Sequence, residues 1–202
     1  MTPPRPLPRI HVIRHGETEW SLSGQHTSRT DILLTARGEA QGRLLGKRLD
    51  GIKFSRVFTS PRFRARQTCE LAGLGASAEI EPNLREWDYG DYEGRTSAEI
   101  RGERPGWNLF VDGALRGESP TEVYARADSF VRRLHQMDGE IAVFSHGHFL
   151  RVLATAWIGS PVIHAQRFGL NTASVGILSY EHESPDSPII SLWNETAAVN
   201  PL

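Results

Sequence analysis

Short apolar runs rich in β-branched residues alternate along the chain with longer segments whose apolar residues recur at helical spacing. The short runs predict strands at residues 9–14, 56–59, 141–145, 174–180 and 189–193. The periodic segments predict helices after Thr35, from Ser60–Pro61 to about residue 72, after Ser119, and over residues 149–158. Strands that alternate with helices in this way predict an α/β fold, a three-layer α/β/α sandwich around a mostly parallel sheet.

Residues 81–118 interrupt this alternation. They hold many charges, several Gly and Pro residues, and large aromatic side chains, without a clear strand or helix period. We interpret this segment as a lid inserted into a single domain that spans residues 1–202. No internal repeat and no linker divides the chain.

Charge excludes one large class of partners. The sequence has 24 acidic and 23 basic residues and a formal net charge of -1, so no overall field favours nucleic acid or an anionic membrane. Lys47 and Lys53 are the only lysines, and every other basic residue is arginine, whose fork of donors fits phosphate or carboxylate. Codon bias toward arginine accounts for most of this excess. We therefore assign a role in anion binding only to arginines that lie beside other candidate site residues.

Cysteine content and hydropathy indicate the compartment. Cys69 is the only cysteine, so no intrachain disulfide can form. No apolar run approaches the roughly 20 residues of a membrane span, and the first ten residues have four prolines and no apolar signal-peptide core. We expect a cytoplasmic protein without nucleic-acid or membrane partners, a monomer or a homodimer.

Two predicted strands end in the same dipeptide, His15–Gly16 and His146–Gly147. Ligands of open α/β sheets bind at the carboxyl ends of the strands, so both imidazoles can face one crevice. Arg14 adjoins the first histidine, and Arg64 lies in the first turns of the helix after Ser60. Two guanidiniums beside two imidazoles suit a phosphoryl group, whose oxygens share negative charge in the transition state.

Four motifs in order resemble one family. They are R-H-G-E-T-E-W at residues 14–20, S-P-R-F-R-A-R-Q-T at 60–68, L-R-E-W-D-Y-G at 84–90 and S-H-G-H at 145–148. Together they resemble the histidine phosphatase superfamily, in its phosphoglycerate-mutase-like branch, over roughly residues 9 to 181.

The resemblance implies a role for each matching residue. His15 matches the nucleophile that becomes phosphohistidine, and Glu86 matches the carboxylate that protonates the leaving oxygen and then activates water. Arg14, Arg64 and His146 match the groups that hold the phosphoryl oxygens. The scheme needs no metal and no cofactor. The residues expected to contact the rest of the substrate are Ser21, Thr27, Tyr89, Gly147 and Arg104.

Departures from the family pattern bear on the substrate. The mutases carry a paired-arginine stretch after the Glu86 motif, and none occurs between Glu86 and Ser119, so a phosphatase is favoured over a mutase. Residues 87–94, W-D-Y-G-D-Y-E-G, look closer to the fungal sedoheptulose-bisphosphatase type. Arg95, Arg104 and Arg116 are candidates for contacting a second anionic group. We expect a metal-independent phosphatase acting on a small phosphorylated metabolite, a sugar phosphate or bisphosphate.

Three other interpretations remain open. The first is a phosphoglycerate-type phosphomutase, and the second is a non-catalytic module that binds a phosphorylated ligand in the same pocket. The third is a metal site on His146 and His148, although no Asp or Cys lies nearby at ligand spacing.

Overall fold

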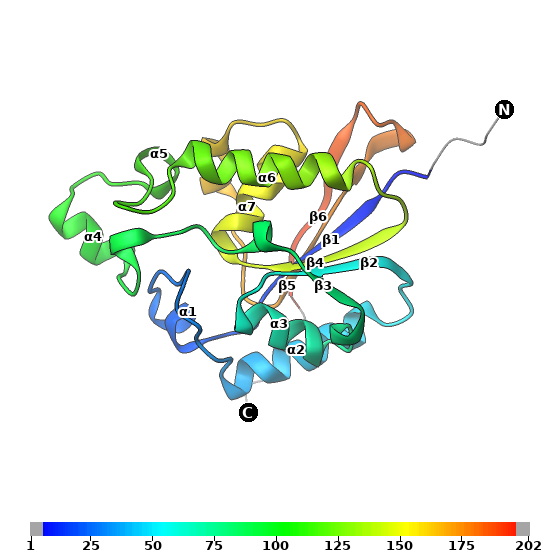
Figure 1. Cartoon of the computed structure of the whole chain (residues 1–202), viewed down its shortest axis with the longest axis horizontal. Coiled ribbons are helices and arrows are strands. Elements are labelled where there is room, and N and C mark those ends of the chain that lie inside the picture. The colour runs from blue at the N-terminus through cyan, green and yellow to red at the C-terminus, as the bar shows by residue number, and fades with distance from the viewer. Residues whose placement is uncertain (1–5, 197–202) are drawn as a thin grey trace.

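A six-stranded sheet in the order β3–β2–β4–β1–β5–β6 forms the middle layer of the computed structural model, which describes residues 6–196 (Figure 1). The strands are β1 Arg9–Arg14, β2 Phe54–Thr59, β3 Ala78–Ile80, β4 Glu140–Ser145, β5 Ser174–Tyr180 and β6 Pro188–Thr196. β1, β2, β3 and β4 pair in parallel, whereas β5 pairs antiparallel with both β1 and β6. The expected α/β fold with a mostly parallel sheet is confirmed. The proline-rich start, expected to be no signal peptide, lies partly outside the described residues.

Helices cover both faces of this sheet, as Figure 1 shows. The α-helices are α1 Glu19–Ser23, α2 Ala36–Leu49, α3 Phe63–Leu71, α4 Ser97–Glu103, α5 Leu109–Asp112, α6 Pro120–Leu134 and α7 Gly147–Trp157. Short 3-10 turns are η1 Gly75–Ser77, η2 Pro82–Leu84, η3 Gly90–Tyr92, η4 Val162–Arg167 and η5 Glu181–Glu183. Among residues 6–196, no helix is both long and apolar enough to span a bilayer.

Alternate residues of the central strands feed two separate cores. On β4, Ile141 and Val143 join the apolar cluster of α6 and α7, while Ala142 and Phe144 join the cluster on the α2 and α3 side. Successive strand side chains point to opposite faces, so a strand covered on both faces must be apolar throughout. This explains why β4 appears in the sequence as an uninterrupted apolar run.

Helix starts show where local sequence signals hold and where they fail. Thr35 and Ser119 cap α2 and α6 as expected, and Ser119 forms the reciprocal capping box with Glu122. The prediction that Ser60 caps the next helix is wrong, because α3 begins at Phe63 after Arg62. The N–H of Ser60 instead donates to Phe144 O at 2.9 Å and continues the β2–β4 pairing.

One more predicted boundary differs from the structure, and one strand was not predicted. α7 starts at Gly147 rather than Phe149, directly after β4, so the turn from strand to helix lies at His146. The three-residue β3 was not expected, because its residues 78–80 have no run of apolar side chains.

Residues 81–118 contain no strand and hold only the short helices η2, η3, α4 and α5. Trp87, Tyr89, Tyr92 and Trp107 from this segment are buried in the same apolar cluster as α6 and α7. In Figure 1 the green segment around α4 extends beyond the sheet at the side where α1 lies. The segment is therefore tied to the main core by its aromatic residues.

Glycine allows α2 to lie against the chain that follows β1. A Cβ atom at Gly38 would lie 2.1 Å from Glu17 O, and one at Gly16 would lie 2.5 Å from Gly38 O. Helix and loop are further joined because Thr35 donates through both its N–H and its hydroxyl to Glu17. The position of His15 beside this contact therefore depends on backbone atoms in van der Waals contact.

We expect Gly38→Ala to destabilise the fold by roughly 1–3 kcal/mol, because the added methyl group must displace backbone. Gly102→Ala in α4 is the matched control, since a Cβ there meets nothing within 4 Å. That control should change the unfolding free energy by no more than about 1 kcal/mol, in the stabilising direction. Urea denaturation of both variants measures the difference, and equal unfolding free energies would show that the close approach costs nothing.

Candidate active site

The parallel pairing of β1 with β4 brings the two predicted histidines together. The last register pair is Arg14 with Ser145, so His15 and His146 follow directly at the carboxyl ends of neighbouring strands. The N–H of His15 donates to Ser145 O at 3.0 Å, and the two ring centroids are 5.3 Å apart. Both side chains are buried. The two imidazoles are thus in edge contact, but only His15 reaches the cavity described below, because His146 is fully buried.

The hydrogen bond of His15 fixes which ring nitrogen is free. Nδ1 lies 2.7 Å from Gly16 O, and a carbonyl oxygen can only accept, so Nδ1 carries the proton and Nε2 keeps its lone pair. Burial, then Arg64, then Arg14 hold the pKa of His15 well below its ordinary value. His15 is therefore a neutral imidazole with an available Nε2 near pH 7.

The buried Arg64 and the half-buried Arg14 flank His15 with donors that are only partly used. Arg64, at 0% exposure, donates to Thr30 O at 3.1 Å and Thr27 O at 2.9 Å, and Arg14 donates to Leu170 O at 2.5 Å. The buried side-chain atoms without a hydrogen-bond partner in the described part of the chain are Nε of Arg14, Arg62 and Arg64, and Nδ1 of His146. Buried polar groups are normally paired, so donors left over in one place fit a bound anion.

His146 is held by the serine that was expected to cap a helix. Its Nε2 lies 2.7 Å from Ser60 Oγ, which also accepts from Arg62 N at 3.2 Å. While Ser60 Oγ accepts from Arg62 N, its hydroxyl proton can be donated to His146 Nε2. The proton of His146 then lies on Nδ1, which has no hydrogen-bond partner. Burial and the neighbouring Arg64 lower the pKa of His146 well below its ordinary value.

Glu86 lies at the N-terminus of α7. Its Oε1 accepts from Trp87 N at 2.9 Å and Phe149 N at 2.8 Å, and its Oε2 accepts from His148 N at 3.1 Å. A carboxylate at this end of a helix binds N–H groups that have no partner within the helix. Three bonds to backbone fix the orientation of the group, and Oε2 keeps a lone pair for another partner.

Arg14, His15 and Glu86 border a cavity of about 220 Å³. It is lined by Arg14, His15, Thr18, Trp20, Ser21, Gly24, Gln25, His26, Thr27, Glu86, Tyr89, Ser97, Gly147, His148, Arg151 and Leu170. Seven of the expected residues are among them: Arg14, His15, Ser21, Thr27, Glu86, Tyr89 and Gly147.

Three other expected residues do not line this cavity. Arg64 and His146 are fully buried against His15, and act on it through charge and ring contact. Arg104 is exposed and donates to Tyr92 Oη at 2.9 Å, so the structure does not bring it to the cavity.

Two of the small residues that line the cavity, Ser21 and Gly147, also contact other parts of the protein. The hydroxyl of Ser21 accepts from Thr18 N and donates to Thr18 O, as part of the cap of α1. Gly147 leaves room for Arg14, because a Cβ there would lie 3.2 Å from the guanidinium carbon. Both residues therefore shape the cavity as well as line it.

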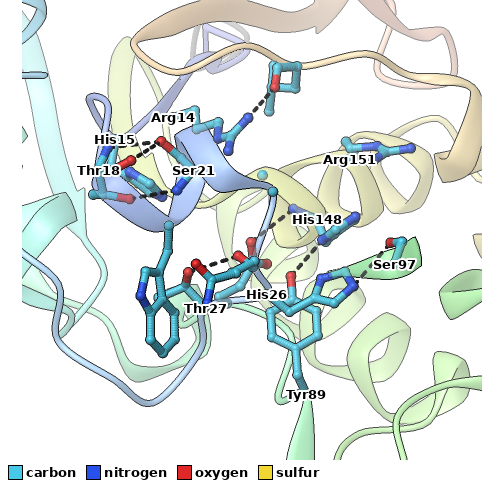
Figure 2. A pocket seen from close by; sticks show the side chains of 16 residues that line it. Arg14, His15, Thr18, Ser21, His26, Thr27, Tyr89, Ser97, His148 and Arg151 are labelled. Atoms are coloured by element: carbon cyan, nitrogen blue, oxygen red, sulfur yellow. Dashed lines mark hydrogen bonds between the residues drawn. The ribbon is translucent and has the colours of Figure 1, made fainter. Parts of the chain in front are cut away.

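Sequence reasoning named Tyr89 as a substrate contact and His148 only as a possible metal ligand, and it missed the other polar side chains on this side of the cavity, His26, Ser97 and Arg151. Figure 2 shows two hydrogen-bonded pairs, Tyr89 with His148 and Ser97 with His26, and Arg151 nearby. Tyr89 Oη lies 2.6 Å from His148 Nδ1, and burial raises the pKa of Tyr89 well above its ordinary value. The phenol therefore keeps its proton, and when it donates that proton to Nδ1, His148 carries its own proton on Nε2. Arg151 was detectable from helical spacing, since it lies one turn after Gly147 in α7.

Within residues 6–196, no group of three or more His, Cys, Asp or Glu side chains is placed to hold a metal ion. His148 Nδ1 is bonded to Tyr89, and His146 Nε2 is bonded to Ser60. The two histidines that prompted the metal-site interpretation therefore each use one ring nitrogen for a hydroxyl group.

Buried neutral histidines make stability depend on pH. Burial lowers the pKa of His26 to about 4, whereas in the unfolded chain its pKa is about 6.5. Between pH 6.5 and about 4, His26 binds a proton in the unfolded chain but not in the folded one. The free energy of unfolding therefore falls as the pH falls through this range. Each such histidine contributes up to about 1.4 kcal/mol per pH unit.

We therefore expect the unfolding free energy of His26→Gln to depend less steeply on pH than that of the unmodified chain between pH 6 and 4.5. Urea denaturation at several pH values, in phosphate-free buffer, measures both slopes. Parallel slopes would contradict the assignment of His26 as neutral in the folded state.

Comparison with known proteins agrees with this geometry. The histidine phosphatase superfamily (branch 1) matches residues 10–196. An acid phosphatase of Mycobacterium tuberculosis is 41% identical over 86% of this chain and 87% of that protein. The sedoheptulose 1,7-bisphosphatase of Saccharomyces cerevisiae is 34% identical over 94% of this chain and 93% of that protein. The solved structure of open reading frame Rv3214 from Mycobacterium tuberculosis superposes with a TM-score of 0.87 at 38% identity, covering 93% of this chain and 97% of that chain. The chain belongs to the histidine phosphatase superfamily, branch 1.

Proposed function

We propose that this protein hydrolyses the phosphomonoester of a small metabolite through a phosphohistidine on His15. The observation that carries the proposal is the neutral imidazole with a free Nε2, bordered by buried guanidiniums whose Nε atoms have no partner. Relatives named as phosphatases support the same reaction class.

In the first step, His15 Nε2 attacks phosphorus and the bond from phosphorus to the ester oxygen breaks. The electron pair of that bond goes to the leaving oxygen, which takes a proton from the Glu86 carboxyl group. Arg14 lines the cavity and stabilises the charge on the phosphoryl oxygens directly. Arg64 and His146 are buried beside His15 and add a fixed positive charge and an unpaired Nδ1 that are in place before the substrate arrives.

In the second step, Glu86 takes a proton from water, and the water oxygen attacks the phosphoryl group on His15. The bond from phosphorus to nitrogen breaks, its electron pair returns to Nε2, and inorganic phosphate leaves. Glu86 has then regained from water the proton that it gave in the first step, and His15 is again neutral, so the cycle balances without a further reactant.

The shape of the cavity supports a leaving group with a second acidic function, such as a sugar bisphosphate. A second cavity of about 260 Å³ adjoins the first and shares His26, Ser97, His148 and Arg151 with it. Arg101 also lines this second cavity, beside aromatic and amide side chains. A cation at the far end and neutral imidazole donors between the two ends suit a hydroxylated carbon chain.

The three arginines expected from sequence to serve this purpose are placed elsewhere. Arg95 pairs with Glu103, Arg104 bonds to Tyr92, and Arg116 pairs with Asp91. Arg101 and Arg151, which line the second cavity, take their place as the proposed contacts for the second anionic group.

Residues 81–118 supply Glu86, Tyr89 and Ser97 to the first cavity. We propose that this segment acts as a lid over the site within one domain. A lid that brings the proton donor would keep bulk water away from the phosphoryl group during the first step.

A rapid-quench experiment with ³²P-labelled substrate tests the covalent intermediate. We expect acid-labile label on the unmodified protein and none on His15→Ala, whose turnover should fall by at least about 10³-fold. His182→Ala is the matched control, because that side chain is 88% exposed and is not part of the cavity lining. Full turnover by His15→Ala would overturn the proposal. Transfer of the label to phosphoglycerate in preference to water would indicate the mutase instead.

A substrate pair tests the second anionic group. We expect Arg151→Met to raise KM for a ketose bisphosphate about tenfold, equivalent to about 1.4 kcal/mol, and to leave KM for the monophosphate nearly unchanged. Arg104→Met is the control, since its guanidinium lies outside both cavities. Equal effects on the two substrates would contradict the assignment.

A further inference from the structure

Arg126 on α6 contacts the Glu86 segment from behind, without lining either cavity. Its side chain is 6% exposed and forms a two-pronged ion pair with Glu118, whose side chain is 13% exposed. Arg126 Nε donates to Oε1 at 2.9 Å, and Nη2 donates to Oε2 at 2.7 Å. Burying an ion pair costs desolvation energy and is weak support for stability, so the pair calls for another role.

The rest of the guanidinium binds the backbone that leads into the proton donor and the carbonyl of the proton donor itself. Nη1 donates to Asn83 O at 2.6 Å and to Arg85 O at 2.8 Å, and Nη2 also donates to Glu86 O at 3.3 Å. Together with the two bonds to Glu118, all five N–H groups of Arg126 have an acceptor. Lysine offers three donors and no planar fork, so it cannot reproduce this arrangement.

Glu118 fixes the chain that follows Glu86. Its Oε2 accepts from Asp88 N at 2.8 Å, and its backbone N–H donates to Asp88 O at 2.9 Å. Its carbonyl oxygen accepts from Trp87 Nε1 at 2.9 Å. The same ion pair therefore holds the backbone before and after the proton donor.

Arg126 also touches the residue that orients the carboxylate. Its guanidinium carbon lies 4.5 Å from the ring centre of Phe149, over the face of the ring. The N–H of Phe149 donates to Glu86 Oε1 at 2.8 Å. One buried side chain thus links the Glu86 backbone to the helix end that binds its carboxylate.

We propose that the Arg126–Glu118 pair is a positioning device that holds Glu86 at the distance required for proton transfer to the leaving oxygen. The inference rests on the function proposed above, because it concerns the same proton. Neither residue of the pair touches the cavity, so both act through Glu86. A misplacement of about 1 Å at a reacting group can cost on the order of 10²-fold in rate.

The test compares a leaving group that needs a proton with one that does not. We expect Arg126→Lys and Arg126→Met to lower kcat/KM for an alkyl phosphate by about 30- to 100-fold. For p-nitrophenyl phosphate, whose leaving group departs as the anion, the loss should stay within about threefold. If Arg126→Met does not fold, Arg126→Lys carries the test, because it keeps a cation beside Glu118 and loses only the fork.

Arg133→Met is the matched control. Arg133 lies two turns further along α6, pairs with Glu81 and covers the Phe58 ring at 4.9 Å, so it has the same kinds of contact in another place. We expect this variant to lower the unfolding temperature while the ratio of kcat/KM for the two substrates stays unchanged.

Glu86→Gln separates failure of this inference from failure of the proposed function. If Glu86→Gln leaves the ratio unchanged, Glu86 is not the proton donor and both proposals fall. If Glu86→Gln changes the ratio of kcat/KM for the alkyl phosphate to that for p-nitrophenyl phosphate, and Arg126→Lys lowers kcat/KM equally for both substrates, only the positioning role is overturned. The expected result is that Arg126→Lys has no further effect on the ratio in the Glu86→Gln background.

Discussion

The site depends on the pairing of β1 with β4. Because these neighbouring strands are parallel and in register at Arg14 and Ser145, the residues that follow them lie side by side at the carboxyl ends of the strands. The ring contact between His15 and His146 is a direct consequence. The β2 strand pairs with β4 on its other side, and Ser60 at its end reaches His146. Three separate segments thus converge because backbone hydrogen bonds fix where each strand stops.

The same edge concentrates positive charge in a protein of nearly zero net charge. Two guanidiniums with little or no solvent access lie beside neutral imidazoles, and burial lowers the pKa of Arg14 and Arg64 while Glu86 opposes the shift. A phosphoryl group would bring the missing negative charge and satisfy the unpaired donors. The low charge of the whole chain is therefore compatible with strong local attraction for a small anion.

The many arginines fall into groups that differ in burial and in what their guanidiniums bind. Arg14 and Arg64 surround the nucleophile, and Arg126 uses all five of its donors behind the Glu86 segment. Others form exposed ion pairs within one helix, such as Arg43 with Glu39, which are worth only a few tenths of a kcal/mol. The buried members require arginine rather than lysine, because their planar forks reach several acceptors away from water.

Local signals in the sequence determined the strand alternation, the caps of α2 and α6, and the two histidines at strand ends. These features depend on neighbouring residues and on the periods of strand and helix, so one chain is enough to see them. The family resemblance added Glu86, which lines the cavity as expected. Tertiary structure alone decided that Ser60 bonds to His146 and does not cap α3, and that Arg151 rather than Arg104 reaches the cavities. It also placed Arg126 behind Glu86, 40 residues away in sequence. Such contacts depend on how distant elements pack against each other, and no local period or cap records that packing.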